Sequence, residues 1–122
     1  MSRKPLVSIL MNCFNGEVFL QEALESVLRQ SYKNWELIFW DNKSTDKSID
    51  IISRVEDKRI KIFSSQDHSN LGKARKNAFN KAKGDYLAFL DVDDLWEKNK
   101  LKNQLEVFVD KEVGVAFTNS LY

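Results

Sequence analysis

The sequence contains one cysteine, Cys13, and one histidine, His68, in 122 residues. A single cysteine excludes an internal disulfide and fits a reducing compartment. Nothing near Cys13 in the sequence suggests a partner that would activate it as a nucleophile, so we favour a structural role. His68 lies in the polar segment 65–70 and, without a second histidine or cysteine beside it, is a poor zinc ligand.

The sequence also lacks a long apolar run and an excess of charge of either sign. The run from Leu6 to Met11 is far too short for a signal sequence or a membrane span. Nineteen basic and eighteen acidic side chains leave a formal charge of +1, so no global field attracts nucleic acid or an anionic membrane. We therefore expect no nucleic-acid partner, no transmembrane segment in this chain and a cytoplasmic location, with the inner membrane surface as the alternative for a full-length protein.

No repeat, low-complexity tract or linker divides the chain, and its length suits one domain with a proper core. Hydrophobic residues make up 43% and charged residues 30%, as in ordinary globular proteins. Short apolar runs alternate with segments of helical periodicity throughout. This pattern predicts an α/β fold: a Rossmann-like, mostly parallel sheet flanked by helices, with right-handed crossovers.

The expected strands cover 6–11, 35–40, 60–63, 86–90 and 113–118. Helices are expected from 17 to about 30, from an N-cap at Ser44 with Asp46 in the first turn, from about 71 to a cap at Gly84, and after Trp96. The apolar faces of the last two helices are expected to carry Ala74, Ala78, Phe79 and Ala82, and Leu101, Leu105 and Phe108, respectively.

Three carboxylates follow the apolar run 86–90 within four positions: Asp91, Asp93 and Asp94. Ligands of open α/β sheets bind beyond the carboxyl ends of such strands, and Asp41, after strand 35–40, is expected at the same edge. Acids this close repel one another unless a cation lies between them, and Mg²⁺ and Mn²⁺ prefer carboxylates combined with substrate phosphates. The alternative is a solvated loop whose acids merely end the strand.

Several segments resemble the family 2 glycosyltransferases with the GT-A fold. Residues 7–15 and 23–32 resemble the opening of that family, and 40–46 (WDNKSTD) resembles its D-D-G-S-T-D segment. Residues 74–78 (ARKNA) are similar to its A-R-N-x-G helix start, with one residue inserted. Residues 84–96 resemble its G-E-Y-I-A-F-L-D-x-D-D segment. The resemblance covers nearly the whole chain in the right order.

The resemblance implies an inverting transferase that binds a nucleotide-diphosphate sugar, with a UDP-sugar as the first choice. Asp93 would be the main ligand of Mn²⁺ or Mg²⁺, and Asp91 would lie near the metal or the ribose. Lys73 or Arg75 would approach the diphosphate, where a bound cation acts as a Lewis acid. The resemblance implies that the following residues surround the nucleotide sugar: Asn12, Phe14, Asn15, Asp41, Asn42, Lys73, Arg75, Asp91 and Val92.

Two positions depart from the family pattern. Asn42 stands where a second acid is usual, which leaves the base identity open, since an amide both donates and accepts. Asp41 and Asn42 either line the base pocket, or Asp41 only caps the next helix. Lys43 replaces the usual glycine, so a positive φ there would be costly.

The acceptor-binding half of the family, which holds the catalytic base, normally follows the fifth strand. We therefore expect residues 1–122 to form the nucleotide-sugar-binding domain of a longer protein, with the base beyond Tyr122. Alone, this domain should bind without turnover, and its acceptor, whether glycan, lipid or protein, is not identified. An uncovered sheet edge, including Trp96 or Val115, would favour a homodimer.

Three alternative functions are compared with the sequence. A haloacid-dehalogenase-like phosphatase would carry its acidic strand first and Thr or Val where Leu95 stands. A receiver-like signalling domain would need acids after the first strand and a lysine after the fifth, where this chain has Asn12 and Asn119. A nucleotide-binding module without catalysis is the third.

Overall fold

The computed structural model describes residues 5–68 and 70–110 and contains one sheet of parallel strands in the order β3-β2-β1-β4. The α/β prediction is confirmed. The elements in chain order are β1 (Val7–Cys13), α1 (Glu17–Leu28), β2 (Trp35–Asp41), α2 (Ser48–Ser53), β3 (Ile60–Ser64), α3 (Leu71–Lys81), β4 (Tyr86–Phe89) and α4 (Lys100–Asp110).

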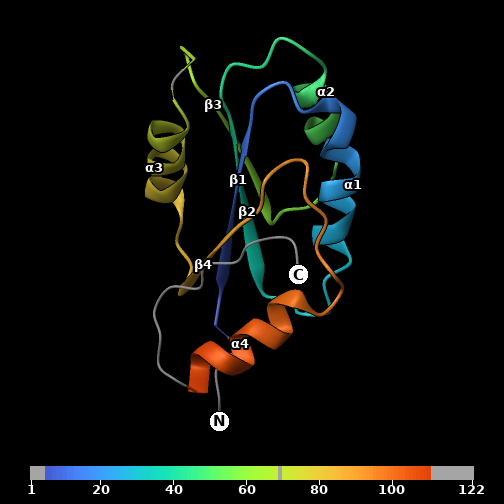
Figure 1. Cartoon of the computed structure of the whole chain (residues 1–122), viewed down its shortest axis with the longest axis vertical. Helices are drawn as coiled ribbons and strands as arrows, with labels where there is room; N and C mark the ends of the chain where they lie inside the picture. The colour runs from blue at the N-terminus through green and yellow to red at the C-terminus, as the bar shows by residue number, and fades with distance from the viewer. Residues whose placement is uncertain (1–4, 69, 111–122) are drawn as a thin grey trace.

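The helices lie on both sides of the sheet: α1 and α2 on one side, α3 on the other, and α4 near the end where β1 begins (Figure 1). Alternate residues of β1 face opposite layers. Ile9 and Met11 enter the larger apolar cluster, and Leu10 enters a smaller one with Ile38 and with Ala78 of α3. Burial on both faces explains why β1 and β2 are nearly continuous apolar runs. In the described part of the chain, no helix combines the length and apolar character needed to cross a bilayer.

The start of α2 differs from the prediction. This helix begins at Ser48, its N-cap is Lys47, and no side chain caps it. The Ser44 hydroxyl instead accepts the backbone N–H of Asn15 at 2.9 Å, and Asp46, which precedes the helix, accepts the N–H groups of Glu17 and Ser48 at 3.0 and 2.9 Å. The N-cap assigned to Ser44 is wrong because this hydroxyl links the β2–α2 loop to the β1–α1 loop.

The end of α3 also differs. Its last residue is Lys81 and its C-cap is the extended Ala82, so the capping role predicted for Gly84 is wrong. A Cβ at Gly84 would lie 2.7 Å from the backbone nitrogen of Ser8. Glycine is required there because the chain passes closely against β1 as it enters β4.

Two burial predictions are corrected. Phe79 is 52% exposed, although Ala74 and Ala78 of the same helix are buried, because their face alone meets the sheet. Trp96, expected at an exposed edge, is 4% exposed and belongs to the larger cluster with Leu101 and Leu105. The predicted strand 113–118, with Val115, and the Phe108 side chain lie outside the described residues. The homodimer stays a prediction.

A buried carboxylate, Glu36, connects the strands near their amino ends. It accepts the Ser8 hydroxyl of β1 at 2.6 Å, the Lys61 ammonium of β3 at 2.7 Å, and the backbone N–H of Lys83 at 2.7 Å. Ser8 in turn accepts the N–H of Gly84 at 2.7 Å. Burial alone would raise the pKa of Glu36, but the hydrogen bonds from Lys61, Ser8 and Lys83 outweigh it and hold that pKa below its usual value.

Replacing Glu36 by glutamine should lower the free energy of unfolding by about 1–3 kcal/mol at neutral pH, since the Lys61 ammonium loses its charged partner. A carboxyl group whose pKa is lowered by folding stabilises the fold at pH values above its pKa in the unfolded chain. This contribution is lost as the pH falls through the pKa that the group has in the folded chain. The effect of Glu36→Gln should therefore shrink below the ordinary glutamate pKa of about 4.3. Urea unfolding at pH 7 and pH 3 measures it.

The matched control is Glu56→Gln, which changes an exposed carboxylate in the α2–β3 connection. Equal destabilisation by the two variants at pH 7 would contradict the role given to the Glu36 network.

Candidate functional site

The strands end at different heights along the sheet. β1 and β2 pair to their last residues, Cys13 with Asp41, but β4 pairs with β1 only as far as Leu10 with Phe89. One further backbone bond, from Leu90 N–H to the Leu10 carbonyl at 3.0 Å, ends the contact. The chain then turns, and the Asp94 N–H donates to the Asp91 carbonyl at 3.0 Å. This turn brings the acids of 91–94 together.

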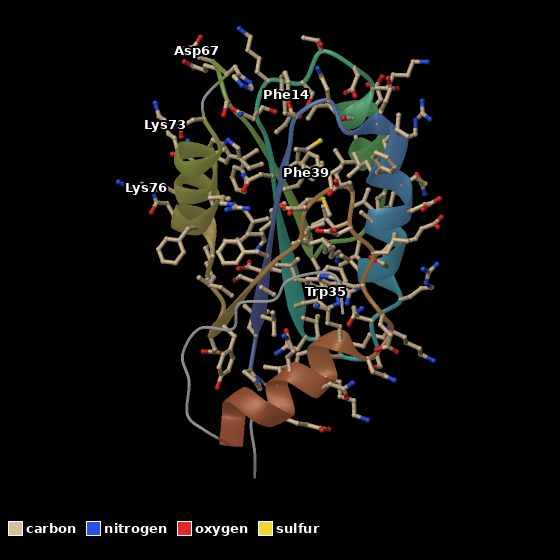
Figure 2. All side chains as sticks on the ribbon, viewed as in Figure 1. Phe14, Trp35, Phe39, Asp67, Lys73 and Lys76 are labelled. Carbon is tan, nitrogen blue, oxygen red and sulfur yellow. The ribbon has the colours of Figure 1, made fainter. Side chains whose placement is uncertain are left out.

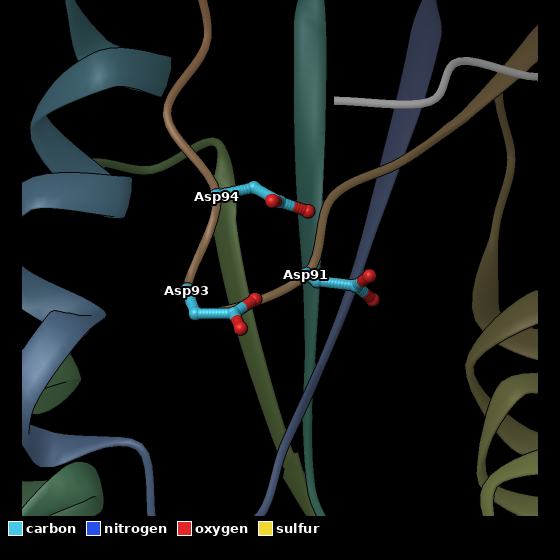
Figure 3. Close-up of side chains that lie close together, drawn as sticks. All are labelled: Asp91, Asp93 and Asp94. Carbon is cyan, nitrogen blue, oxygen red and sulfur yellow. The ribbon is translucent and has the colours of Figure 1, made fainter. Parts of the chain in front are cut away.

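The acidic cluster consists of Asp91, Asp93 and Asp94, whose carboxylate oxygens can all lie within 4.8 Å of one another (Figure 3). Burial, and then the neighbouring charges of Asp94 and Asp93, raise the pKa of Asp91, against an opposing effect of Arg75. An all-oxygen donor set of this kind fits Mg²⁺ or Mn²⁺. The residues that the sequence singled out as metal ligands therefore do lie together, and Asp94 joins them.

Arg75, in the second turn of α3, faces the acidic cluster. Its Nη2 lies 3.7 Å from Oδ1 of Asp91, and both side chains are about half exposed. An ion pair with this exposure is weak, because water and salt screen it. Arg75 therefore offsets part of the negative charge but leaves the cluster open to a stronger cation.

At the same edge of the sheet as the acidic cluster, a first cavity of about 230 Å³ opens at the carboxyl ends of β1 and β2. It contains three of the residues predicted to contact a nucleotide: Asn12, Phe14 and Asn42. The Asn12 amide donates to the Ala74 carbonyl at 3.1 Å, which ties β1 to α3. Ala74 lines the first cavity and the next residue, Arg75, approaches Asp91, so α3 contacts both features. The full lining is Asn12, Cys13, Phe14, Asn42, His68, Asn70 and Ala74.

Four lining residues are not among the predicted nucleotide contacts, namely Cys13, His68, Asn70 and Ala74, and His68 has the largest polar side chain of the four. Its Nδ1 lies 3.2 Å from the Asn42 carbonyl, and its ring meets Phe14 edge-on with 4.4 Å between centroids. From the sequence alone, His68 is a poor candidate for a zinc ligand, and no other role is indicated. His68 follows β3 by four residues, and the carboxyl end of β3 lies at the same edge of the sheet as that of β2. This position in the sequence indicates a residue near the ligand-binding edge.

A second cavity, of about 330 Å³, lies between the β3–α3 segment and α3. Figure 2 labels Asp67 and Lys73 from this region. Lys73 thus lies in the second cavity, not in the first. The lining is Trp40, Ser64, Ser65, Gln66, Asp67, His68, Lys73 and Asn77.

Asp41 and the residue after it are buried at the end of β2. Oδ2 of Asp41 accepts the Ser44 N–H at 2.9 Å, whereas its buried Oδ1 has no hydrogen-bond partner among the described residues. Asp41 therefore does not cap α2, which begins at Ser48. Lys43 has φ 62°, so the left-handed backbone that suits glycine occurs here with a lysine, at a cost of about 1–3 kcal/mol.

Asn15 and Val92 do not line the first cavity, and each has contacts elsewhere. Oδ1 of Asn15 accepts the Thr45 N–H at 2.7 Å and so joins the two loops. Val92 is partly buried against the core, and a Cβ added at Gly16 would overlap its methyl groups. Contact of these two residues with a nucleotide sugar stays a prediction.

The comparison with known families agrees with this geometry. Residues 8–122 match the model of Glycosyl transferase family 2. The chain belongs to this family. The membership excludes the phosphatase-like and receiver-like alternatives, because their folds and motif orders differ from those of glycosyltransferases.

Curated members of the family match over most of the chain. TuaG of Bacillus subtilis, named a putative teichuronic acid biosynthesis glycosyltransferase, is 39% identical over 94% of this chain and 46% of its own length. WfgD of Escherichia coli, named a UDP-Glc:alpha-D-GlcNAc-diphosphoundecaprenol beta-1,3-glucosyltransferase, is 35% identical over 93% of this chain and 45% of its own. The chain thus spans about half the length of these glycosyltransferases.

Solved glycosyltransferases share the fold. S. aureus TarS 1-349 in complex with UDP-GlcNAc is 28% identical, with a TM-score of 0.80 over 86% of this chain and 31% of its own. The mannosyltransferase PcManGT of Pyrobaculum calidifontis, in complex with GDP-Man and Mn²⁺, has a TM-score of 0.83 over 89% of this chain and 34% of its own. At 22% identity, the second supports the fold alone.

Removing the charge of Arg75 should make the acidic cluster a better cation site. Because the guanidinium offsets the charge of Asp91, Arg75→Gln should tighten the binding of Mn²⁺ alone by about two- to fivefold at low ionic strength. Electron paramagnetic resonance of free Mn²⁺ measures the affinity.

The control is Lys76→Gln, which removes the same charge from the next residue, an exposed side chain on the outer side of α3 (Figure 2). Weaker Mn²⁺ binding by Arg75→Gln, or the same change in both variants, would show that Arg75 does not act on the cluster.

Proposed function

We propose that this chain is the donor-binding part of a glycosyltransferase. In this proposal the base of a nucleoside diphosphate sugar occupies the first cavity and the diphosphate lies at the acidic cluster. The observation that carries it is that both features lie at the carboxyl edge of the sheet and contact consecutive residues of α3, since Ala74 lines the first cavity and Arg75 lies 3.7 Å from Asp91. Family membership and the TarS complex with UDP-GlcNAc support it.

We assign base reading to Asp41 and Asn42. Buried polar atoms in proteins are normally hydrogen-bonded, and the unpartnered Oδ1 of Asp41 can accept a ring N–H of a base. Asn42 lines the first cavity, and Phe14 offers an aromatic surface there. UDP is our first choice of nucleotide, since the ring N–H of uracil suits a carboxylate acceptor.

Asp93 and Asp91 would hold Mn²⁺ or Mg²⁺. Such an ion, when bound, stabilises the negative charge that develops on the departing diphosphate. Arg75 supplies a second positive charge on the α3 side, where it can bind a phosphate oxygen, and Lys73 lies one residue before Ala74. These residues therefore bind and orient the donor and stabilise its leaving group.

Inverting transfer further needs a base within reach of the acceptor hydroxyl, on the sugar face opposite the diphosphate. The acidic cluster is engaged on the diphosphate side, so we place this base outside the described residues. Transfer to an acceptor is accordingly proposed for the whole protein, and donor binding for this chain. The 1–122 assignment as a nucleotide-sugar-binding domain is part of this proposal.

Titration calorimetry with UDP tests the proposal. Mn²⁺ should tighten UDP binding by about tenfold or more, equivalent to about 1.4 kcal/mol, and Asp93→Ala should abolish this dependence on metal. In the whole enzyme the same substitution should slow transfer by about a hundred- to thousandfold. The control is Asp50→Ala, which removes an exposed carboxylate from α2. Equal UDP affinity with Mn²⁺ and with a chelator, in the parent and in Asp93→Ala, would reject the metal-dependent site.

A further inference from the structure

We propose that the outward side of α3 is a docking surface for an anionic phospholipid membrane. This inference goes beyond the proposed nucleotide-sugar function and does not depend on it. We call the surface the basic face, and it is formed by exposed side chains of α3 and of the residues just after it: Lys73, Lys76, Phe79, Lys81 and Lys83.

Positive charge is concentrated in this part of the chain. Residues 70–84 contain five basic side chains and no acidic one, although the whole chain has a formal charge of only +1. The rest of the chain is therefore net negative. A near-zero net charge gives no long-range attraction, but a local excess on one surface still attracts an anionic partner within a Debye length, about 10 Å at 0.1 M salt.

The helix turns this surface away from the sheet. Successive residues of an α-helix are about 100° apart, so Lys76 lies opposite Ala74 and Ala78, which are buried towards the sheet. Figure 2 shows Lys73 and Lys76 on the outer side of α3. Phe79 follows Lys76 by three positions, which makes the two side chains neighbours on the helix surface, and Phe79 is 52% exposed.

The lysines of the basic face have no acidic partner in the described part of the chain. Among residues 5–68 and 70–110, the ion pairs lie elsewhere, and no carboxylate is within ion-pair distance of these four ammonium groups. A solvated helix commonly combines both signs, as α1 does where Glu25 pairs with Arg29, four positions later, at 3.9 Å. Like charges on one helix side repel one another, so an anionic partner would relieve that repulsion.

Aromatic rings lie among these charges. Nζ of Lys81 is 5.2 Å from the centroid of the Phe63 ring, which stacks on Trp40 with 6.1 Å between centroids. Both rings are only partly buried against the smaller apolar cluster. Lysines beside aromatic rings are typical of proteins that bind the headgroup layer, because the ammonium groups meet lipid phosphates while an exposed ring such as Phe79 enters the boundary with the acyl chains.

A nucleic acid is the other anionic polymer to consider, and the basic face suits it less. Single strands are bound along a groove by a series of stacking aromatic rings, whereas Phe79 is the one aromatic residue of the basic face. Arginine binds phosphate through two parallel hydrogen bonds, but the single arginine of α3, Arg75, approaches Asp91 instead. A bilayer presents many phosphates in one plane, which the exposed side of a single helix can contact.

Co-sedimentation with lipid vesicles tests the inference on the whole chain. The chain should bind vesicles of equal parts phosphatidylglycerol and phosphatidylcholine, but not vesicles of phosphatidylcholine alone. Raising the NaCl concentration from about 50 mM to about 500 mM should weaken this binding by about tenfold or more, because salt screens the lysines.

The test variant combines Lys76→Gln, Lys81→Gln and Lys83→Gln, and it keeps Lys73 because the proposed donor site uses that residue. It should bind the anionic vesicles more weakly by about tenfold or more, since each lysine near an anionic surface contributes about three- to fivefold. Phe79→Ser, tested separately, should weaken binding by about threefold.

The control variant removes three charges elsewhere on the surface and should bind the vesicles as the parent does: Lys33→Gln, Lys47→Gln and Lys58→Gln, all exposed residues outside α3. It has the same net charge as the test variant, so it separates a local surface from a general charge effect. Far-UV circular dichroism should show the same helix content in all variants, because every changed side chain is exposed.

Equal binding to neutral and anionic vesicles, no binding to either, or equal losses in the test and control variants would overturn the inference. Tighter binding to an oligonucleotide than to the anionic vesicles, lost in the test variant, would also overturn it and would assign the basic face to nucleic acid. None of these outcomes bears on UDP binding, which is measured separately.

Discussion

The buried charge of Glu36 constrains the sheet more than any other single group. A carboxylate that is 3% exposed is tolerated only with partners, and its partners come from β1, β3 and the segment that enters β4. A one-residue slip of β2 would turn Glu36 into the larger apolar cluster and leave it unpaired. The network near the amino ends of the strands thus helps to fix the register that aligns Cys13 with Asp41 at the other end.

That register creates the site through the unequal lengths of the strands. Because β4 stops pairing at Phe89, the last residues of β1 have no strand beside them on that side among residues 5–68 and 70–110. The turn 91–94 uses this space, and Val92 anchors it by packing against Gly16. The acids of the turn consequently lie at the carboxyl edge of the sheet, close enough to α3 for Arg75 to reach Asp91. A longer β4 would carry the acids past the cavity.

Patterns of neighbouring residues in the sequence predicted the strands and the acidic cluster, which depend on short segments of the chain. The apolar runs located β1, β2 and β4, and the acids after β4 indicated the cluster that the fold does assemble. The errors concern contacts between distant residues: Ser44 binds Asn15, 29 positions away, and Gly84 lies against Ser8, 76 positions away. Hydrophobic periodicity indicates local secondary structure and does not predict contacts between distant residues. His68 is a different case, because a lone histidine in a polar segment indicates only a poor metal ligand, whereas its position after β3 places it at the carboxyl edge of the sheet.

The β1–α1 and β2–α2 loops are held by hydrogen bonds within the protein, whereas the acidic cluster has only weak charge pairing in the described residues. In the loops that follow β1 and β2, two non-glycine residues, Asn15 and Lys43, have positive φ, a conformation that persists only where surrounding contacts over-determine it. Here those contacts are the mutual hydrogen bonds of the two loops, from Asn15 N–H to Ser44 Oγ and from Thr45 N–H to Asn15 Oδ1. At the acidic cluster, by contrast, the ion pair of Asp91 with Arg75 is weak and exposed, and Asp94 interacts electrostatically with Lys100. The two loops are therefore fixed by contacts within the protein, whereas the like charges of Asp91, Asp93 and Asp94 repel one another and would be stabilised most by a bound cation.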